Sequence, residues 1–516
     1  MLSRLALALL LVGLWSMPAH ARWRMASSEN FVIYADDSSR DLEQFGRLLE
    51  RYHQAMEKLT GHTTETPSPS NRLTIFVVGG QRDMGRLSGA GNSIAGFYVP
   101  RAGGSVAFVQ DLRLTSGNPN MSMVVLLHEY AHHFAIAASS FAMPQWASEG
   151  SAEFFASSRF ATNGEVEIGR PALHRAGDLF YARDVPIRQL LDAELYAANR
   201  GNRFDAFYGR SWLLYHYLSL GTERNGQLSA YYAALREGLA ALPAAERAFG
   251  DLDQLEADLD GYLRGRRMAM LTFAPGTLVA GEVAVRELSD GMDAALPLII
   301  RSRRGVTREM ALELLPELRA VAAAHPDDAG VLGALAEAEF DAGNDAEAIA
   351  AADRALASDP ATVNAYIQKG YALFRMADEA EDADAAYAAA MRPFTALNRI
   401  EPDHPLPLIY FYQSFAWRGA EPDQLARHAL ERASQLAPFD QSLTLMTALS
   451  LAQEGKIALA SSYALPVATS PHGGRLAEQA RQFRAALAGA VEGEAFIWTP
   501  PASEADPEPG LPDPAS

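Results

Sequence analysis

The sequence predicts an α+β domain followed by an all-α domain of helical repeats. Near the amino terminus, two strand-like segments flank an amphipathic helical pattern, and further helical patterns follow. After Thr307 the chain becomes alanine-rich, and its small and apolar residues fall near the positions of a helical repeat of about 34 residues. Because 516 residues exceed what one hydrophobic core usually supports, we expect two or more domains.

The amino terminus has the layout of a secretory signal peptide. Arg4 precedes an apolar run at 5–15, and Ala19-His20-Ala21 offers a small-x-small cleavage site. An uncleaved membrane anchor is the competing interpretation, but the run is shorter than the roughly 20 residues that a spanning helix needs. We therefore expect residues 1–21 to be removed and the mature chain to have no stable membrane insertion.

The cysteine content and the net charge limit which cellular compartment and which kinds of binding partner we expect. The chain has no cysteine, which excludes disulfides and a thiolate zinc site, and export without cysteine suggests a bacterial periplasm. Removing residues 1–21 takes away one arginine and no acid, so the formal net charge of −19 becomes −20. That charge disfavours nucleic acid and anionic membrane surfaces as partners.

The first domain is expected to span residues 22–270. Residues 30–35 and 72–78 predict strands, and residues 41–60 predict an amphipathic helix between them. The glycines at 79–80 and 89–91 mark loops, and residues 201–267 are again helical in pattern.

The most informative motif is His128-Glu129-Tyr130-Ala131-His132. An α-helix turns once per about 3.6 residues, so both imidazoles lie on one helix face and can reach a single metal ion. Glu129 lies about 100° further round the helix, where its carboxylate can act as a general base on a water without being a ligand. Apolar residues at 121–127 and 134–136 predict that this helix is buried.

A catalytic zinc site needs a third protein ligand and an open fourth position. Glu149 follows His132 by 17 residues, in the segment Trp146-Ala-Ser-Glu-Gly, and Glu153 lies one helical turn further on. We expect one Zn²⁺ per chain, held by His128, His132 and Glu149. Glu153 would accept a hydrogen bond from the outer nitrogen of a ligand histidine and so fix its tautomer.

These residues resemble the gluzincins, the metallopeptidase clan that includes thermolysin and the aminopeptidase N family. Residues 146–150 are similar to the Trp-Leu-Asn-Glu-Gly segment that carries the third ligand in aminopeptidase N relatives. The segment Phe207-Tyr-Gly-Arg-Ser-Trp is similar to the one whose tyrosine stabilises the oxyanion in that family. The resemblance covers about a fifth of the chain and implies a zincin-like peptidase fold, zinc as cofactor, and an oxyanion role for Tyr208. The alternative for Tyr208 is half-buried packing.

One departure from that family bears on the type of peptidase. Aminopeptidase N relatives hold the substrate's amino terminus with a Gly-x-Met-Glu-Asn glutamate, whereas residues 91–127 contain no glutamate. We therefore expect an endopeptidase or another amide hydrolase, and a cell-wall peptide is a compatible substrate. Residues 104–109 are strand-like and are predicted to be the edge strand that pairs with an extended peptide.

Other polar side chains near these motifs have less specific roles. His174, Tyr181 and His216 are candidate transition-state donors. His133 follows the ligand His132 but points about 100° away from it, so we expect an ordinary polar residue.

The remaining chain divides into a connector, repeats and a tail. Residues 271–306 read as a connector or small subdomain, and residues 307–490 as a domain resembling tetratricopeptide repeats (TPRs). The clearest repeat has its key residues at Leu332, Leu335, Gly343, Ala348, Ala355 and Pro360. An alanine-rich bundle without a groove is the alternative. Residues 491–516 are proline-rich and acidic and are expected to be disordered.

Together these features predict an exported zinc peptidase whose repeats recruit a protein partner or a substrate. The rival is a periplasmic scaffold that keeps the metallopeptidase fold without turnover. Glu129 argues against the rival, because a purely structural zinc site has no need of a base beside an open position.

Overall fold

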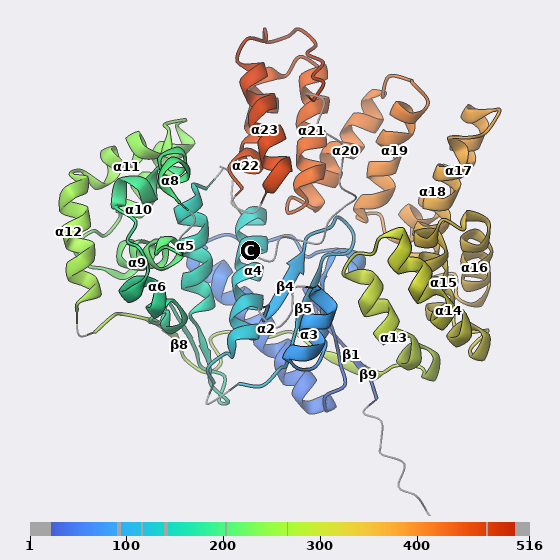
Figure 1. Cartoon of the computed structure of the whole chain (residues 1–516), viewed down its shortest axis with the longest axis horizontal. Helices are drawn as coiled ribbons and strands as arrows, with labels where there is room; N and C mark the ends of the chain where they lie inside the picture. Colours follow the sequence, from blue (N-terminus) through green and yellow to red (C-terminus); the bar gives the residue numbers. More distant parts are fainter. Residues whose placement is uncertain are drawn as a thin grey trace, which may run out of the picture.

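The computed structural model describes residues 22–89, 94–114, 117–138, 143–201, 204–265, 267–470 and 473–500. An α/β part near the amino terminus is flanked by a helical lobe on one side and by an arc of helix pairs on the other (Figure 1). The predicted signal peptide at 1–21 lies outside the described residues. Within the described residues, none of the helices is both long and apolar enough to cross a membrane.

The α/β part is built on a six-stranded sheet with the order β4-β5-β3-β2-β1-β9. Its strands are β1 (Arg24–Ser27), β2 (Phe31–Ala35), β3 (Leu73–Val77), β4 (Gly96–Val99), β5 (Val106–Val109) and β9 (Ala284–Glu287). Strands β2, β3 and β5 run parallel, with Ile33 opposite Ile75 and Ile75 opposite Ala107, while β1, β4 and β9 pair antiparallel. The strands predicted at 30–35 and 72–78 are β2 and β3.

The prediction for residues 104–109 was wrong about their place in the sheet. They contain β5, which is hydrogen-bonded to β4 on one side and to β3 on the other, so it is not an edge strand. All four β5 residues are buried, as expected for a strand covered on both faces. The edge strand on this side is β4.

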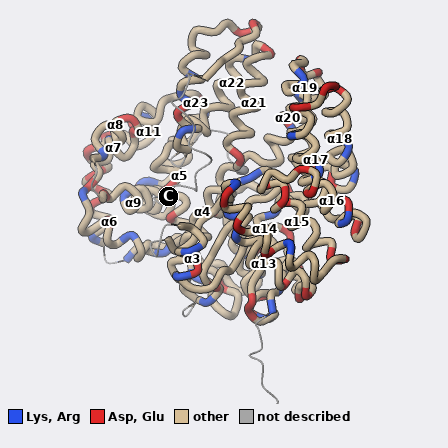
Figure 2. The backbone as a smooth tube through the Cα atoms, turned by 45° about the vertical axis from the view of Figure 1, so that its right-hand side comes forward, with Lys and Arg blue, Asp and Glu red and all other residues tan. Residues whose placement is uncertain are grey.

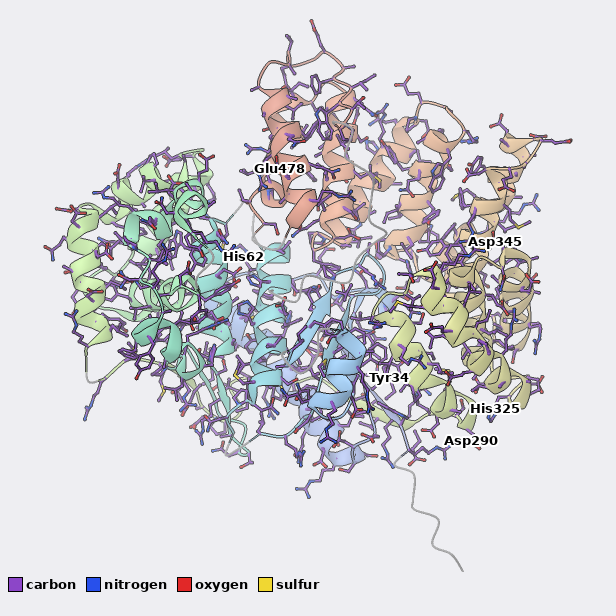
Figure 3. The ribbon with its side chains drawn as sticks, in the orientation of Figure 1. Tyr34, His62, Asp290, His325, Asp345 and Glu478 are labelled. Atoms are coloured by element: carbon purple, nitrogen blue, oxygen red, sulfur yellow. The ribbon has the colours of Figure 1, made fainter. Side chains whose placement is uncertain are left out.

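Helices cover both faces of the sheet because its side chains alternate between two cores. On one face, Ile33, Ile75 and Ala107 pack with helices α2 (Ser39–Thr60) and α4 (Met121–Ala138). On the other face, Phe76 and Phe108 pack with α3 (Gln81–Ser88) and α13 (Asp290–Arg303). An aromatic row, which includes Tyr34 (labelled in Figure 3) stacked 5.4 Å from Phe76, lines this second face.

The helical lobe follows α4 and packs on the same core. It contains α5 (Gln145–Ala156), α6 (Ala176–Tyr181), α7 (Ile187–Leu191), α8 (Ala193–Asn199), α9 (Phe207–Leu220), α10 (Gln227–Arg236), α11 (Ala241–Phe249) and α12 (Leu252–Leu263). A small sheet, β6 (Arg159–Phe160), β7 (Val166–Ile168) and β8 (Leu271–Phe273), extends below it.

The carboxyl-terminal part is a TPR-like helical domain. After α13 come α14 (Arg308–Ala324), α15 (Ala329–Ala342), α16 (Asp345–Ser358), α17 (Val363–Ala377), α18 (Ala383–Ile400), α19 (Pro405–Trp417), α20 (Gln424–Leu436), α21 (Gln441–Gln453), α22 (Ile457–Ala468) and α23 (Gly474–Leu487). Successive helices pack as pairs that form an arc (Figure 1), which Figure 2 shows from a second side. Asp345, the first residue of α16, is labelled in Figure 3. A Cβ on Gly370 would lie 2.4 Å from the Phe394 ring, so α17 and α18 approach closely there.

Two predicted boundaries differ from the structure. Residues 271–306 are not a separate unit: β8 joins the small sheet, β9 extends the main sheet beside β1, and α13 starts the helix stack. Residues 491–500, predicted to begin a disordered tail, pack on the last helices. The Phe496 amide donates to the Ala452 carbonyl, and the Trp498 ring lies 5.5 Å from that of Phe483.

Candidate metal centre

Two neighbouring helices supply the predicted ligands. Helix α4 begins where the Asn120 side chain accepts a hydrogen bond from the Met123 amide, and its buried residues Leu127 and Phe134 fix it on the sheet. Helix α5 packs against α4. This arrangement turns His128 and His132 of α4 toward Glu149 of α5.

The three predicted ligand atoms form a compact triangle. The Nε2 atoms of His128 and His132 lie 3.1 Å apart, and Glu149 Oε2 lies 3.4 Å from the first and 3.5 Å from the second. Ligands about 2.05 Å from a tetrahedral zinc are about 3.3 Å from one another. The spacing of these atoms therefore fits one tetrahedral ion.

The centre concentrates negative charge in a buried place. Glu149 is fully buried and Glu153 is 1% exposed. Burial lowers the pKa of the His128 imidazole, but hydrogen bonds and charge from Glu149 and Glu153 outweigh it and raise that pKa to about 10. The two carboxylates thus favour a positive charge at His128, which a proton or a metal ion can provide.

Both histidines are oriented through their outer nitrogens. His128 Nδ1 lies 3.2 Å from Glu153 Oε1, the contact expected of Glu153. His132 Nδ1 lies 3.2 Å from the Ser148 hydroxyl. Each contact leaves Nε2 facing the centre of the triangle, which is the geometry that outer partners of metal-binding histidines impose.

His174 and Arg175 complete the surroundings of Glu153, and the sequence motifs did not reveal this role. His174 Nε2 lies 2.5 Å from Glu153 Oε2, while Arg175 donates to Glu153 Oε1 from Nε at 2.9 Å and from Nη2 at 2.5 Å. Burial raises the pKa of Glu153, but His128, His174 and Arg175 hold it well below its usual range. His174 therefore orients Glu153. This contact explains the position of His174 without the transition-state role that was predicted for His174.

Tyr208 lies beside the centre at the start of α9. The Arg175 guanidinium stacks over its ring at 4.7 Å. Burial raises the pKa of Tyr208, the negative field of Glu149 raises it further, and Glu153 and Glu129 act in the same direction. The phenol therefore stays protonated, as a hydrogen-bond donor must.

Gly150 lets α9 approach the ligand helix. A Cβ at this position would lie 2.3 Å from the backbone oxygen of Ser211, a contact that real side chains do not make. The glycine that follows Glu149 thus permits the crossing of α5 and α9 that brings Tyr208 to the site.

Glu129 is half-buried on α4. Its charge contributes to the raised pKa of Tyr208 on α9 and of Tyr98 on β4, after burial and other groups. The carboxylate is therefore close enough to β4 and to α9 for its charge to act on both phenols.

Three other predicted polar residues lie elsewhere. Tyr181 is 91% exposed, and His216 is held between the Gly169 carbonyl at 2.8 Å and the Tyr262 hydroxyl at 2.9 Å, so neither is arranged as a donor at the centre. His133, expected to be an ordinary polar residue, is half-buried: its Nδ1 lies 2.7 Å from the Tyr98 hydroxyl, and burial lowers its pKa to about 3.

Comparisons with known proteins show no family for this chain. No protein-family model matches the chain, and no curated protein matches it. A crystal structure of a thermophilic TPR protein from Thermus thermophilus aligns with 38% of this chain and 98% of its own, at 16% identity and a TM-score of 0.32. The description of the carboxyl-terminal part as TPR-like therefore rests on its own helix pairs.

Proposed function

We propose that the chain is a zinc-dependent peptidase that cleaves within peptide chains. One zinc ion would be held by His128, His132 and Glu149. The observation that carries this proposal is the triangle of donor atoms, with sides of 3.1, 3.4 and 3.5 Å, next to a general-base candidate on the same helix. Two imidazoles and one carboxylate are a known ligand set for catalytic zinc.

The chain's own residues would divide the chemistry between them. A bound zinc would lower the pKa of water toward about 7 and polarise a peptide carbonyl. Glu129 would take a proton from the attacking water and deliver it to the leaving amine. The Tyr208 hydroxyl would donate a hydrogen bond to the developing oxyanion, and Arg175 would hold its ring in place.

The substrate would bind as an extended peptide beside β4. This strand ends one side of the sheet and packs against α4, so a peptide paired with it would run past the metal helix. The missing upstream glutamate supports cleavage within a chain over removal of terminal residues. The predicted signal peptide supports the bacterial periplasm as the place of action.

The helical repeats support a second role in protein binding. Stacked helix pairs offer extended surfaces to protein partners, and here they would recruit a substrate or an accessory protein. The same helices support the rival function, a periplasmic scaffold whose metal centre does not turn over.

A substitution at Glu129 separates these functions. We expect the Glu129→Gln protein to keep about one zinc per chain by elemental analysis and to lose cleavage of a peptide library, because only the base is removed. His132→Ala should lose both zinc and cleavage, and Glu282→Gln, on an exposed loop, should change neither. Cleavage that survives in the Glu129→Gln protein would contradict the assigned base, and native protein without zinc would contradict the peptidase.

A further inference from the structure

The turn between β4 and β5 is held by the repeat domain. The Ala102 amide donates to Asp440 Oδ2 at 3.0 Å, and Ala102 packs in a core that includes Tyr412 and Phe439. Gly103 has φ of +74°, and a Cβ there would lie 2.6 Å from the His404 ring. The turn is therefore closely fitted to the connections α18–α19 and α20–α21.

Side chains before β3 extend the same contact. The Ser70 amide and hydroxyl donate to the two Glu401 oxygens at 2.9 and 2.8 Å. The Asn71 side chain donates to the Leu436 carbonyl at 2.7 Å and accepts from the Gly103 amide at 3.0 Å. We call Glu401, His404, Leu436, Phe439 and Asp440 the docking edge of the repeat domain.

The docking edge contacts helix α4, which carries His128 and His132, through the Phe439 ring. Phe439 stacks on His133 with the ring centroids 4.2 Å apart, and Phe439 is buried while His133 is half-buried. The Tyr98 hydroxyl, on β4, lies 2.7 Å from His133 Nδ1. His133 thus contacts the edge strand and the repeat domain at once, and it directly follows His132.

We infer that the docking edge positions the metal helix, with Phe439 holding the His133 ring and thereby the neighbouring His132 in register with Glu149. The repeats would then be part of the peptidase unit as well as a surface for partners. Phe439 is a positioning residue, since it acts on His132 through the neighbouring His133 ring. The part of this inference that concerns zinc rests on the proposed function.

The physical basis is close packing. Removing a large ring from an enclosed contact leaves a space that the surroundings fill only partly, so His133 and α4 gain freedom. Partners that orient metal-binding histidines typically change metal affinity about 10-fold to 100-fold when they are removed. Phe439 acts one residue further away, so an effect of about 10-fold is expected.

The test compares two buried phenylalanines in the full-length chain. Phe483 lies in the last helix beside Trp498, so Phe483→Ala removes a similar ring from the repeat domain without touching α4. We expect Phe439→Ala to weaken zinc binding about 10-fold in a chelator competition and to alter the visible spectrum of the cobalt-loaded protein. Phe483→Ala should lower the melting temperature but keep the native zinc affinity and spectrum, and Phe439→Leu should restore part of the affinity.

Hydrogen exchange in the metal-free protein gives a second readout that does not depend on zinc. Exchange of the amides in 128–138 should rise in Phe439→Ala and remain native in Phe483→Ala. Equal zinc affinities and equal exchange in the two alanine variants would overturn the inference. If the native protein binds no zinc, the proposed function fails, and the exchange data alone decide whether the edge positions α4.

Discussion

The Nδ1 atom of His128 lies 3.2 Å from Oε1 of Glu153, one turn after Glu149 on α5. Helix α5 therefore supplies both Glu149, which faces the centre, and Glu153, which orients the ligand His128 through its outer nitrogen. Because Arg175 and His174 also bind Glu153, its carboxylate has little freedom to turn away.

Replacing Glu153 should weaken zinc binding more than it changes the fold. Glu153→Gln keeps the shape but removes the charge that favours a positive His128, so we expect zinc affinity to fall about 10-fold to 100-fold. The measurement is zinc competition against a chelator. Glu167→Gln is the control, since Glu167 pairs with Arg159 and Arg170 away from the centre. Equal effects of the two substitutions would contradict the role of Glu153.

Much of the site follows from helical spacing alone. Residues four apart share a helix face, so the positions of His128 and His132, and of Glu149 and Glu153, predict two facing pairs, and the structure brings these four side chains together. His174 and Arg175 could not be found in this way. They lie on a short turn some twenty residues after Glu153, and no local pattern shows that the turn folds back.

The strand positions show where sequence reasoning failed. Residues 106–109 form a continuous apolar run, which is typical of a strand buried on both faces, and the prediction of an edge strand there was wrong. Residues 284–287 pair with β1 in the main sheet, and no local sequence pattern predicts this pairing. In the carboxyl-terminal segment, the proline and acid content predicts disorder. Phe496 and Trp498 nevertheless pack on the last helices.

Stability of the zinc-free protein should depend on pH through His128. Its pKa is raised from 6.5 in the unfolded chain to about 10 in the fold, so protonated His128 stabilises the fold fully below about pH 6.5. This contribution is lost as the pH rises through about 10. Chemical denaturation of the chelator-treated protein from about pH 6 to about pH 10 should show that decline, and the His128→Asn variant should lack it.

Zinc binding should release the same proton. A zinc ligand nitrogen must be deprotonated, so binding at His128 near neutral pH displaces the proton that the two carboxylates retain. Titration calorimetry at about pH 7.5 in buffers of different ionisation enthalpy should report about one proton released per zinc from this residue. A heat of binding that is independent of the buffer would contradict the raised pKa of His128.

Gly150→Ala should separate the two helices that form the site. The new methyl group would lie 2.3 Å from a backbone oxygen of α9, which cannot move as an isolated side chain can. We expect a loss of about 1–3 kcal/mol in the free energy of unfolding, together with weaker zinc binding. Gly261→Ala is the control, because nothing lies within 4 Å of a Cβ there, and it should stabilise α12 by up to about 1 kcal/mol. Denaturant melts of both variants check this, and a stable Gly150→Ala protein would contradict the close crossing.

Tyr208→Phe tests whether the phenol acts on the reaction or only packs beside it. The substitution keeps the ring that lies under Arg175 and removes only the hydroxyl, so folding and zinc content should remain native. If the hydroxyl donates to the oxyanion, kcat should fall about 100-fold to 1000-fold with little change in KM, because the interaction forms in the transition state. Tyr181→Phe, on the exposed end of α6, should leave both constants unchanged. A Tyr208→Phe protein with native kcat would assign the residue to packing, and the oxyanion would then need a donor other than this phenol.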